Sequence, residues 1–188
     1  MFVLVAGLVL FLGIHLVPAL PPLRLALVAR IGEGAYKTTF SVVSALGLGL
    51  IVLGFAWAPR QVPLFAPSPL AVAIAPAAMV VSLTLFAAAN LKGHLRRLVG
   101  HPMLIGTIVW SSVHLAANGD VASTWLFGAF LAWALVDLAS SIARRTAKAF
   151  GPRLAHDVVA IAAGAGAAIA FAFLHRVLFG VRVVPFGL

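Results

Sequence analysis

Long apolar runs, separated by short connections that contain basic residues, dominate the pattern along this chain. Runs that could cross a bilayer lie at residues 2–18, 38–57, 70–91, 102–117, 121–139 and 156–179. Several are close to or below the roughly 20 residues of a spanning helix, so we expect tilt or extension into the flanks. The pattern predicts an all-α fold, a polytopic membrane helix bundle of about six transmembrane helices, as a single domain over residues 1–188.

The distribution of basic residues predicts the orientation of these helices. The first, third and fifth connections hold ten of the 13 Lys and Arg residues. The positive-inside rule therefore places the odd connections in the cytoplasm and both termini outside it. The first run begins at Met1 without a charged lead-in, which favours a retained helix over a removed signal peptide.

The composition excludes a soluble globular domain. Hydrophobic residues make up 63% of the 188 residues and charged residues 9%, and the mean hydropathy is +1.15. The net charge of +9 is explained by helix orientation, so we expect the lipid bilayer as a partner and no nucleic acid. The chain has no cysteine, which excludes thiolate metal sites, iron–sulfur clusters and CxxCH haem attachment.

Three local patterns concern packing and charge. Residues 24–37 combine charged and apolar residues at helical spacing, which predicts a short interfacial helix. Asp137 lies inside a run with Arg144 on the same helical face, which favours a local ion pair over a proton relay. Small residues at every fourth position predict two close helix-packing faces. These are Ser41, Ala45 and Gly49 in one run, and Ala160, Gly164, Ala168 and Ala172 in another.

The run at 102–117 and its flank carry a polar stripe. As a helix, this segment places Thr107, Ser111, His114 and Asn118 on one face. Lipid cannot satisfy polar side chains, so we expect the stripe to face protein or a cofactor.

Two of the six histidines, His15 and His114, lie within apolar runs away from the charged connections. A single membrane histidine more often makes a structural hydrogen bond than ligates a metal. Two imidazoles on different helices, however, suffice as an axial pair for haem if they face each other at one depth. His15 and His114 are therefore the candidate metal ligands.

The depths of these two histidines leave their pairing open. At 1.5 Å per residue, His15 lies roughly 20 Å from the outer face and His114 roughly 20 Å from the inner face. Across a core of about 30 Å, these levels differ by roughly 10 Å. Either one of the two helices is displaced from these positions, or the histidines pair differently. Depth alone would match His15 with His101, and His114 with His175.

A basic collar precedes the polar stripe. Pro102 suits the first turn of a helix, which makes His101 the residue at the helix start. Lys92, Arg96 and Arg97 lie just before it, on the predicted cytoplasmic side. Such a collar suits an anion, either a lipid phosphate or the propionates of a haem. The alternative is an anchor that only satisfies the positive-inside rule.

Four segments carry a resemblance to a known family. They are LVLFLGIHLVPAL, RIGEGAYKTTFSVVSALGL, NLKGHLRRLVGHPMLIGTIVWSSVHLAANGD and LFGAFLAWALVDLASSIARR. Together they resemble the NnrU family of bacterial membrane proteins over nearly the whole chain. That family is similar, more distantly, to the zeta-carotene isomerase of plants and cyanobacteria. The resemblance implies a multi-pass protein of the bacterial inner membrane, linked to nitrite and nitric oxide reduction in denitrification.

The resemblance to the isomerase also implies a haem b that performs redox-controlled cis–trans isomerisation. Its two haem-ligand histidines fall on His15 and His114, and a third proposed ligand, a cysteine, falls on Ser111. A serine cannot ligate haem comparably, so haem is expected here without a ligand switch. The further cofactor contacts that we expect are His101, Arg96, Arg97 and Asn118.

Two alternative functions stay open at this stage. The chain has four carboxylates, none paired at catalytic spacing, and no cysteine, which favours a non-enzymatic assembly or interaction factor. Its partners would be respiratory or denitrification membrane proteins such as the nitric oxide reductase system. The other alternative is a haem-dependent isomerase. The sequence does not decide whether the protein is an enzyme.

Overall fold

The computed structural model describes residues 1–188 except 60–61, 148, 181–182 and 184–188. Within these ranges the chain is helical, and its one β contact is an isolated bridge between Pro63 and Asp120. The helices are α1 Phe2–Leu16, α2 Pro21–Trp57, α3 Pro69–Ala88, α4 His94–Val99, α5 Pro102–Asn118, α6 Val121–Ala143 and α7 Leu154–Phe179, with a 3-10 turn, η1 Val17–Ala19, after α1. The predicted all-α membrane fold is confirmed.

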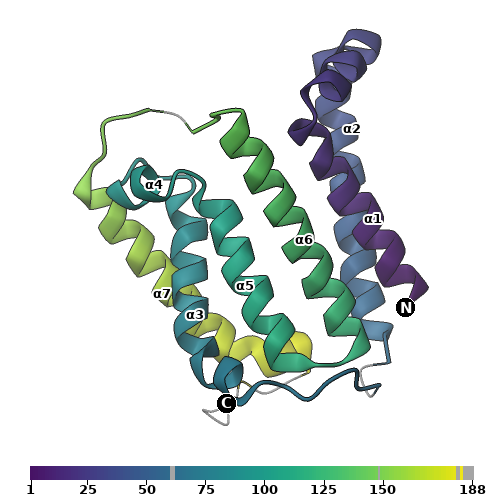
Figure 1. Ribbon diagram of the computed structural model, residues 1–188, viewed down its shortest axis with the longest axis vertical. Helices are drawn as coiled ribbons and strands as arrows, with labels where there is room; N and C mark the ends of the chain where they lie inside the picture. Colours follow the sequence, from purple (N-terminus) through teal and green to yellow (C-terminus); the bar gives the residue numbers. More distant parts are fainter. Residues whose placement is uncertain (60–61, 148, 181–182, 184–188) are drawn as a thin grey trace.

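All six predicted runs form helices. Five helical segments are long and apolar enough to cross a membrane: α1 with η1, α2, α3, α6 and α7. The sixth, α5, has only 17 residues and lies between α3 and α6 (Figure 1). Its short length follows from its two ends, where Pro102 begins the helix and Gly119 ends it in the left-handed conformation.

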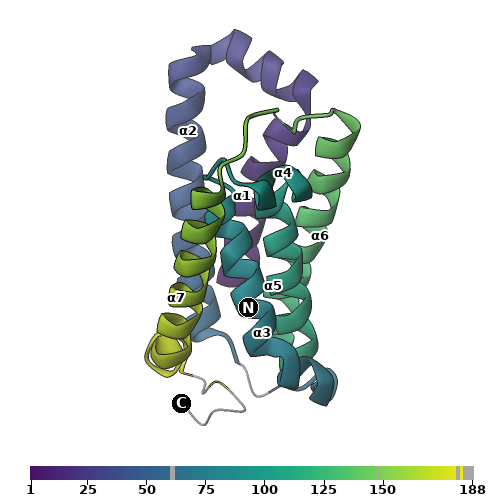
Figure 2. The same cartoon turned by 90° about the vertical axis from the view of Figure 1, so that its left-hand side faces the viewer.

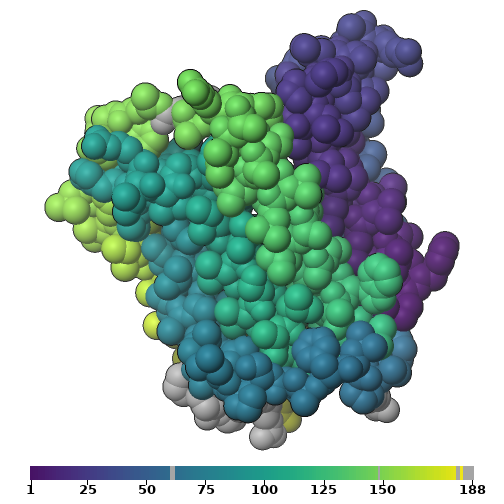
Figure 3. All heavy atoms as spheres, viewed as in Figure 1, coloured from purple at the N-terminus to yellow at the C-terminus, as the bar shows by residue number. Residues whose placement is uncertain are grey.

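The six long helices form one curved layer in the order α2, α1, α6, α5, α3, α7 (Figure 1). Because the layer curves, the two end helices, α2 and α7, lie on the same side of α3, α5 and α6 (Figure 2). Figure 3 shows that side chains fill the spaces between α3, α5 and α6 on the face of the layer seen there. The largest buried cluster lies where α1, α2 and α6 meet. It consists of Leu4, Leu8, Leu12, Ile51, Ala58, Ala122, Leu126 and Phe127.

The arrangement agrees with the predicted alternation of charge. The start of α1 and the end of α7 lie at the same end of the layer (Figure 1). The η1 turn, the start of α2, the α3–α4 connection with α4, and the α6–α7 connection lie at the opposite end, and they carry nine described basic residues. Arg60, Lys148 and Arg182 lie outside the described residues. By the positive-inside rule, the basic end is the predicted cytoplasmic end.

Glycines bring α1 and α2 into close contact. A Cβ on Gly7 would lie 2.6 Å from the backbone N of Ile51, and a Cβ on Gly47 would lie 2.7 Å from the backbone N of Phe11. Gly54 likewise packs against the backbone of α1. The predicted packing face of α2 was wrong, because its three residues are exposed and Gly49 has open space around it. The helix carries two small-residue faces, and spacing alone does not decide which of them is buried.

The predicted packing face of α7 is confirmed. Ala160 is 1% exposed, and Gly164 is buried where a Cβ would meet Thr84 of α3. Ala168 and Ala172 follow on the same face and are half-buried. Small residues here let α7 approach α3 closely enough for backbone contact.

A sharp bend divides α2. Gly32 has φ 81° and ψ 157°, so residues 21–31 form a separate short helical segment, whereas residues 33–37 of the predicted interfacial helix belong to the long segment after the bend. Arg24 reaches across the bend to Glu33 at 3.1 Å and stacks over the Tyr36 ring at 5.6 Å. Lys37 adds a second contact to Glu33 at 3.4 Å.

The ion pair predicted in α6 is also present. Asp137 lies 3.8 Å from Arg144 and accepts a hydrogen bond from Ser141 at 3.4 Å. The neighbouring Ser140 donates to the carbonyl of Ala19 at 2.8 Å, which ties the cytoplasmic end of α6 to η1.

Candidate functional site

The polar stripe of α5 is satisfied by its own helix. Thr107 donates to the Met103 carbonyl at 3.0 Å, and Ser111 donates to the Thr107 carbonyl at 2.6 Å. Asn118 donates to the His114 carbonyl at 2.7 Å. Bonds of this i to i−4 type remove the need for an external partner. The stripe therefore does not require a cofactor. Thr107 and Ser111 are both buried, so these two residues face protein as expected.

His114 belongs to the same stripe and lies in an aromatic setting. Its Nδ1 lies 2.9 Å from the Trp110 carbonyl, so Nδ1 carries the proton in the neutral ring. Its ring packs against Phe127 of α6 at 4.7 Å and against Trp110 at 5.5 Å, measured between centroids. This tautomer leaves the Nε2 lone pair for a ligand. His175 of α7 lies close enough for an electrostatic interaction with His114.

His15 has the same local geometry at the other end of the layer. Its Nδ1 lies 2.6 Å from the Phe11 carbonyl. Its ring lies 4.2 Å from Phe11, 5.0 Å from Phe40 of α2 and 6.0 Å from Trp133 of α6, again between centroids. His15 therefore also presents Nε2 within an aromatic environment formed by three helices.

The structure does not bring His15 and His114 together. They contact different turns of α6, at Trp133 and Phe127, which are about 9 Å apart along the helix axis at 1.5 Å per residue. The space between them is filled by a row of rings. Phe11 packs on Phe130 at 5.9 Å, and Phe130 packs on Trp110 at 5.4 Å. The shared-iron pairing thus stays a prediction that needs a rearrangement of these rings.

The NGD motif forms the turn between α5 and α6. Gly119 adopts φ 85° and ends α5, where a Cβ would collide with the Phe65 carbonyl. Asp120 then caps α6 by accepting from the Ser123 N–H at 2.9 Å. The Leu64 N–H of the α2–α3 connection donates to the Gly119 carbonyl at 2.8 Å. The motif therefore forms a hydrogen-bonded turn at the end of the layer opposite the basic end, and Asn118 belongs to this turn through its bond to the His114 carbonyl.

The predicted collar borders a pocket of about 290 Å³ at the cytoplasmic end. Arg96, Arg97, His101 and Thr146 supply its polar side chains, between α4, the start of α5 and the α6–α7 connection. Arg96 stacks over the Phe150 ring at 5.4 Å, which fixes its guanidinium at the pocket wall. As predicted, α5 begins at Pro102 with His101 at the N-cap. The collar thus forms a defined pocket, although Lys92 is not among the residues that line it.

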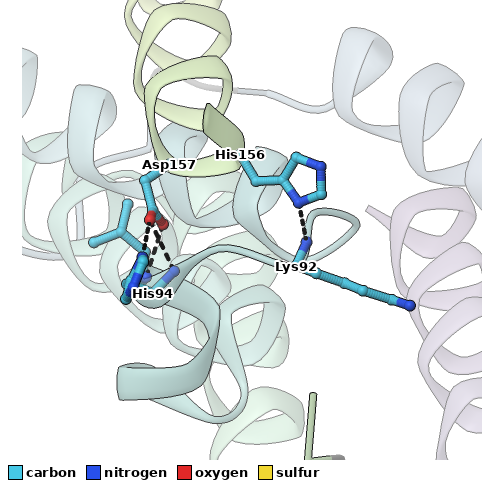
Figure 4. A network of polar contacts seen from close by, with 5 residues as sticks. Lys92, His94, His156 and Asp157 are labelled. Carbon is cyan, nitrogen blue, oxygen red and sulfur yellow. Dashed lines mark hydrogen bonds and ion pairs between the residues drawn. The ribbon is translucent and has the colours of Figure 1, made fainter. Parts of the chain in front are cut away.

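A polar cluster that the sequence did not reveal holds α4 in place (Figure 4). Asp157, at the start of α7, accepts from the backbone N–H groups of His94 and Leu95 at 2.8 and 2.9 Å. The His94 ring bonds to the same carboxylate at 2.8 Å. His156 accepts a hydrogen bond from the Lys92 N–H at 3.1 Å. The partners are more than 60 residues apart, so local patterns could not indicate this contact.

Comparison with known proteins gives one match. No curated protein sequence and no solved structure matches the chain. The sequence profile described as NnrU protein matches residues 3–183, which is nearly the whole chain. The chain therefore belongs to the NnrU family.

Proposed function

We propose that this NnrU protein binds haem b in the bacterial inner membrane and acts in nitrite and nitric oxide reduction. The supporting observation is the shared geometry of His15 and His114. Each ring bonds through Nδ1 to a carbonyl of its own helix, which orients the imidazole and leaves Nε2 for iron. A haem bound there would supply one-electron redox chemistry.

The imidazole nitrogens of His15 and His114 are suitable haem ligands. The separation of the two residues, however, favours only one of them as a ligand of any single iron. His15 and His114 contact turns of α6 that are about 9 Å apart, which disfavours ligation of one iron by both imidazoles. His175 is the alternative partner for His114, because it lies within electrostatic range and matches its depth by residue count. Surrounding rings of Trp110 and Phe127 would exclude water from the imidazole of His114.

An absorption spectrum of the purified protein tests the proposal. After expression with a haem precursor and purification in mild detergent, we expect a Soret band and a b-type pyridine haemochrome. His114→Ala should abolish or shift the band, and His15→Ala and His175→Ala should show which partner shares the iron. The control is His156→Gln, which keeps an acceptor for the Lys92 N–H and should leave the spectrum unchanged. A wild-type sample without haem would refute the proposal.

A second candidate is a non-enzymatic interaction factor for the nitric oxide reductase system. All four carboxylates of the chain make structural contacts. They are Glu33 at the α2 bend, Asp120 at the α6 cap, Asp137 in the α6 ion pair and Asp157 at α4. None of these contacts pairs one carboxylate with another, as general acid–base catalysis by two carboxylates would require. Crosslinking in denitrifying cells tests this role, since reductase subunits should be captured with the chain.

The isomerase alternative has less support. Ser111, at the position of the isomerase cysteine, is fully buried and donates its hydroxyl proton to the Thr107 carbonyl at 2.6 Å. A neutral hydroxyl used in this way is a poor replacement for a thiolate ligand. Redox-controlled exchange of an iron ligand would need a group that Ser111 does not provide.

A further inference from the structure

The cationic pocket at the cytoplasmic end has a chemistry of its own, independent of the haem. We propose that it binds the phosphate of an anionic phospholipid headgroup from the cytoplasmic leaflet. Arg96 and Arg97 would contact the phosphate oxygens, and His101 and Thr146 would supply further hydrogen bonds.

The charge of the lining selects for an anion. Two guanidinium groups and an imidazole border the pocket, and no acidic side chain is among the described residues that line it. Arg96 is half-buried and is held against the Phe150 ring at 5.4 Å, so it is oriented before a ligand arrives. Pre-orientation of this kind reduces the entropy lost on binding.

The surroundings indicate that the anion is carried by a lipid. Leu98 of α4 is 84% exposed directly after Arg97, and Met103 at the pocket wall is 49% exposed. Apolar side chains beside basic ones are typical of a segment at the headgroup level, where acyl chains meet the protein. A soluble anion would contact the arginines but would have no acyl chain to pack against these two side chains.

Haem propionates do not suit the pocket. His101 and His114 are 13 residues apart on α5, or about 20 Å along the axis, which exceeds the distance from a haem iron to its propionates. His15 lies on α1, which is separated from α5 by α6 (Figure 1). The collar and the candidate haem ligands therefore form two separate sites.

The position of α4 supports a preformed site. This helix has six residues, too few to be stable alone, yet the Asp157 carboxylate binds its first two N–H groups (Figure 4). A Cβ on Gly93 would collide with the same carboxylate, so only glycine permits this approach. The contact fixes α4 and with it the two arginines of the pocket.

Native mass spectrometry of the full-length protein in detergent tests the proposal, with phosphatidylglycerol, phosphatidylcholine and inorganic phosphate as probes. We expect the wild type to retain phosphatidylglycerol selectively. Arg96→Gln/Arg97→Gln should weaken retention by about 30-fold, since each basic residue near the surface contributes about 1 kcal/mol. The matched control, Arg30→Gln/Arg153→Gln, removes the same charge from exposed positions at the same end and should retain the lipid.

A second variant leaves the charge unchanged. Ala147 lines the pocket, and Ala147→Leu should fill part of it and displace the lipid without altering the arginines. Equal retention by the wild type, the double Arg variant and Ala147→Leu would overturn the proposal. Equal binding of phosphatidylcholine would do the same. Displacement of phosphatidylglycerol by inorganic phosphate at similar concentration would assign the pocket to a free anion and overturn the lipid assignment.

Discussion

At the scale of residues, the densest sequence motif is used mainly to form turns and caps. The NGD segment terminates one helix, reverses the chain and caps the next helix within three residues. The polar stripe before it bonds to its own backbone. Among the stripe residues, only His114 retains a nitrogen that could bind a metal, its Nε2, and its ring packs against aromatic side chains. The chemistry of this region therefore concentrates in one imidazole.

The cap at Asp120 gives a residue-scale prediction. Asp120→Ala should lower the free energy of unfolding by about 1 kcal/mol, because the Ser123 N–H loses its acceptor at the start of α6. Thermal unfolding in detergent would measure this loss. Asp120→Asn keeps a side-chain acceptor, so it should retain most of the stability. Equal destabilisation by Ala and Asn would show that the negative charge acts elsewhere.

At the scale of elements, helix packing depends on which small residues face a neighbour. In α2, Gly47 and Gly54 are seven residues apart and both contact α1, whereas Gly49 lies on the opposite, open side. In α7, Gly164 contacts Thr84 of α3. The helices of this layer have at most two main neighbours, so one narrow stripe on each helix determines its position.

A pair of glycine variants tests this packing. Gly47→Ala should destabilise the protein by about 1–3 kcal/mol, because the new Cβ would lie 2.7 Å from the Phe11 backbone N and the helices would have to separate. Gly49→Ala adds the same methyl group to open space and should be neutral or slightly stabilising. Chemical denaturation of both variants in one detergent gives the comparison. Similar losses for both would contradict the assigned interface.

Sequence periodicity predicted where the helices lie in the chain better than it predicted which helices and side chains contact one another. Apolar runs and prolines located the six long helices, and the HP dipeptide located the start of α5, because these features act within a few residues. The buried face of α2 was missed, since spacing identifies a face but not the helix that covers it. Asp157 was missed for a related reason. Its carboxylate satisfies N–H groups of α4 more than 60 residues away, and only the tertiary structure brings them together.

The candidate site was predictable to a similar extent. The sequence located the two membrane histidines and the collar, and counting residues indicated that His15 and His114 lie at different levels. In the structure their rings contact Trp133 and Phe127, on turns of α6 about 9 Å apart. The rings of Phe11, Phe130 and Trp110 between them could not be predicted, since they come from three helices.

At the scale of the whole molecule, a single curved layer separates two chemical regions. The basic pocket lies at the end with η1 and α4, and His114 lies near the end with the NGD turn. The end helices α2 and α7 each have one main neighbour in the chain, α1 and α3 respectively. Their remaining faces are rich in exposed apolar side chains, as lipid contact requires. The orientation of the layer therefore decides which compartment each region faces.

That orientation can be measured, because the chain has no cysteine and single cysteines can be introduced without background. Arg153→Cys lies in the α6–α7 connection and Leu64→Cys in the α2–α3 connection, and both native side chains are exposed. In intact spheroplasts, a membrane-impermeant maleimide should label Leu64→Cys at once and Arg153→Cys only after permeabilisation. Labelling in the reverse order would place the arginine pocket outside the cytoplasm, where it could not bind a lipid of the cytoplasmic leaflet.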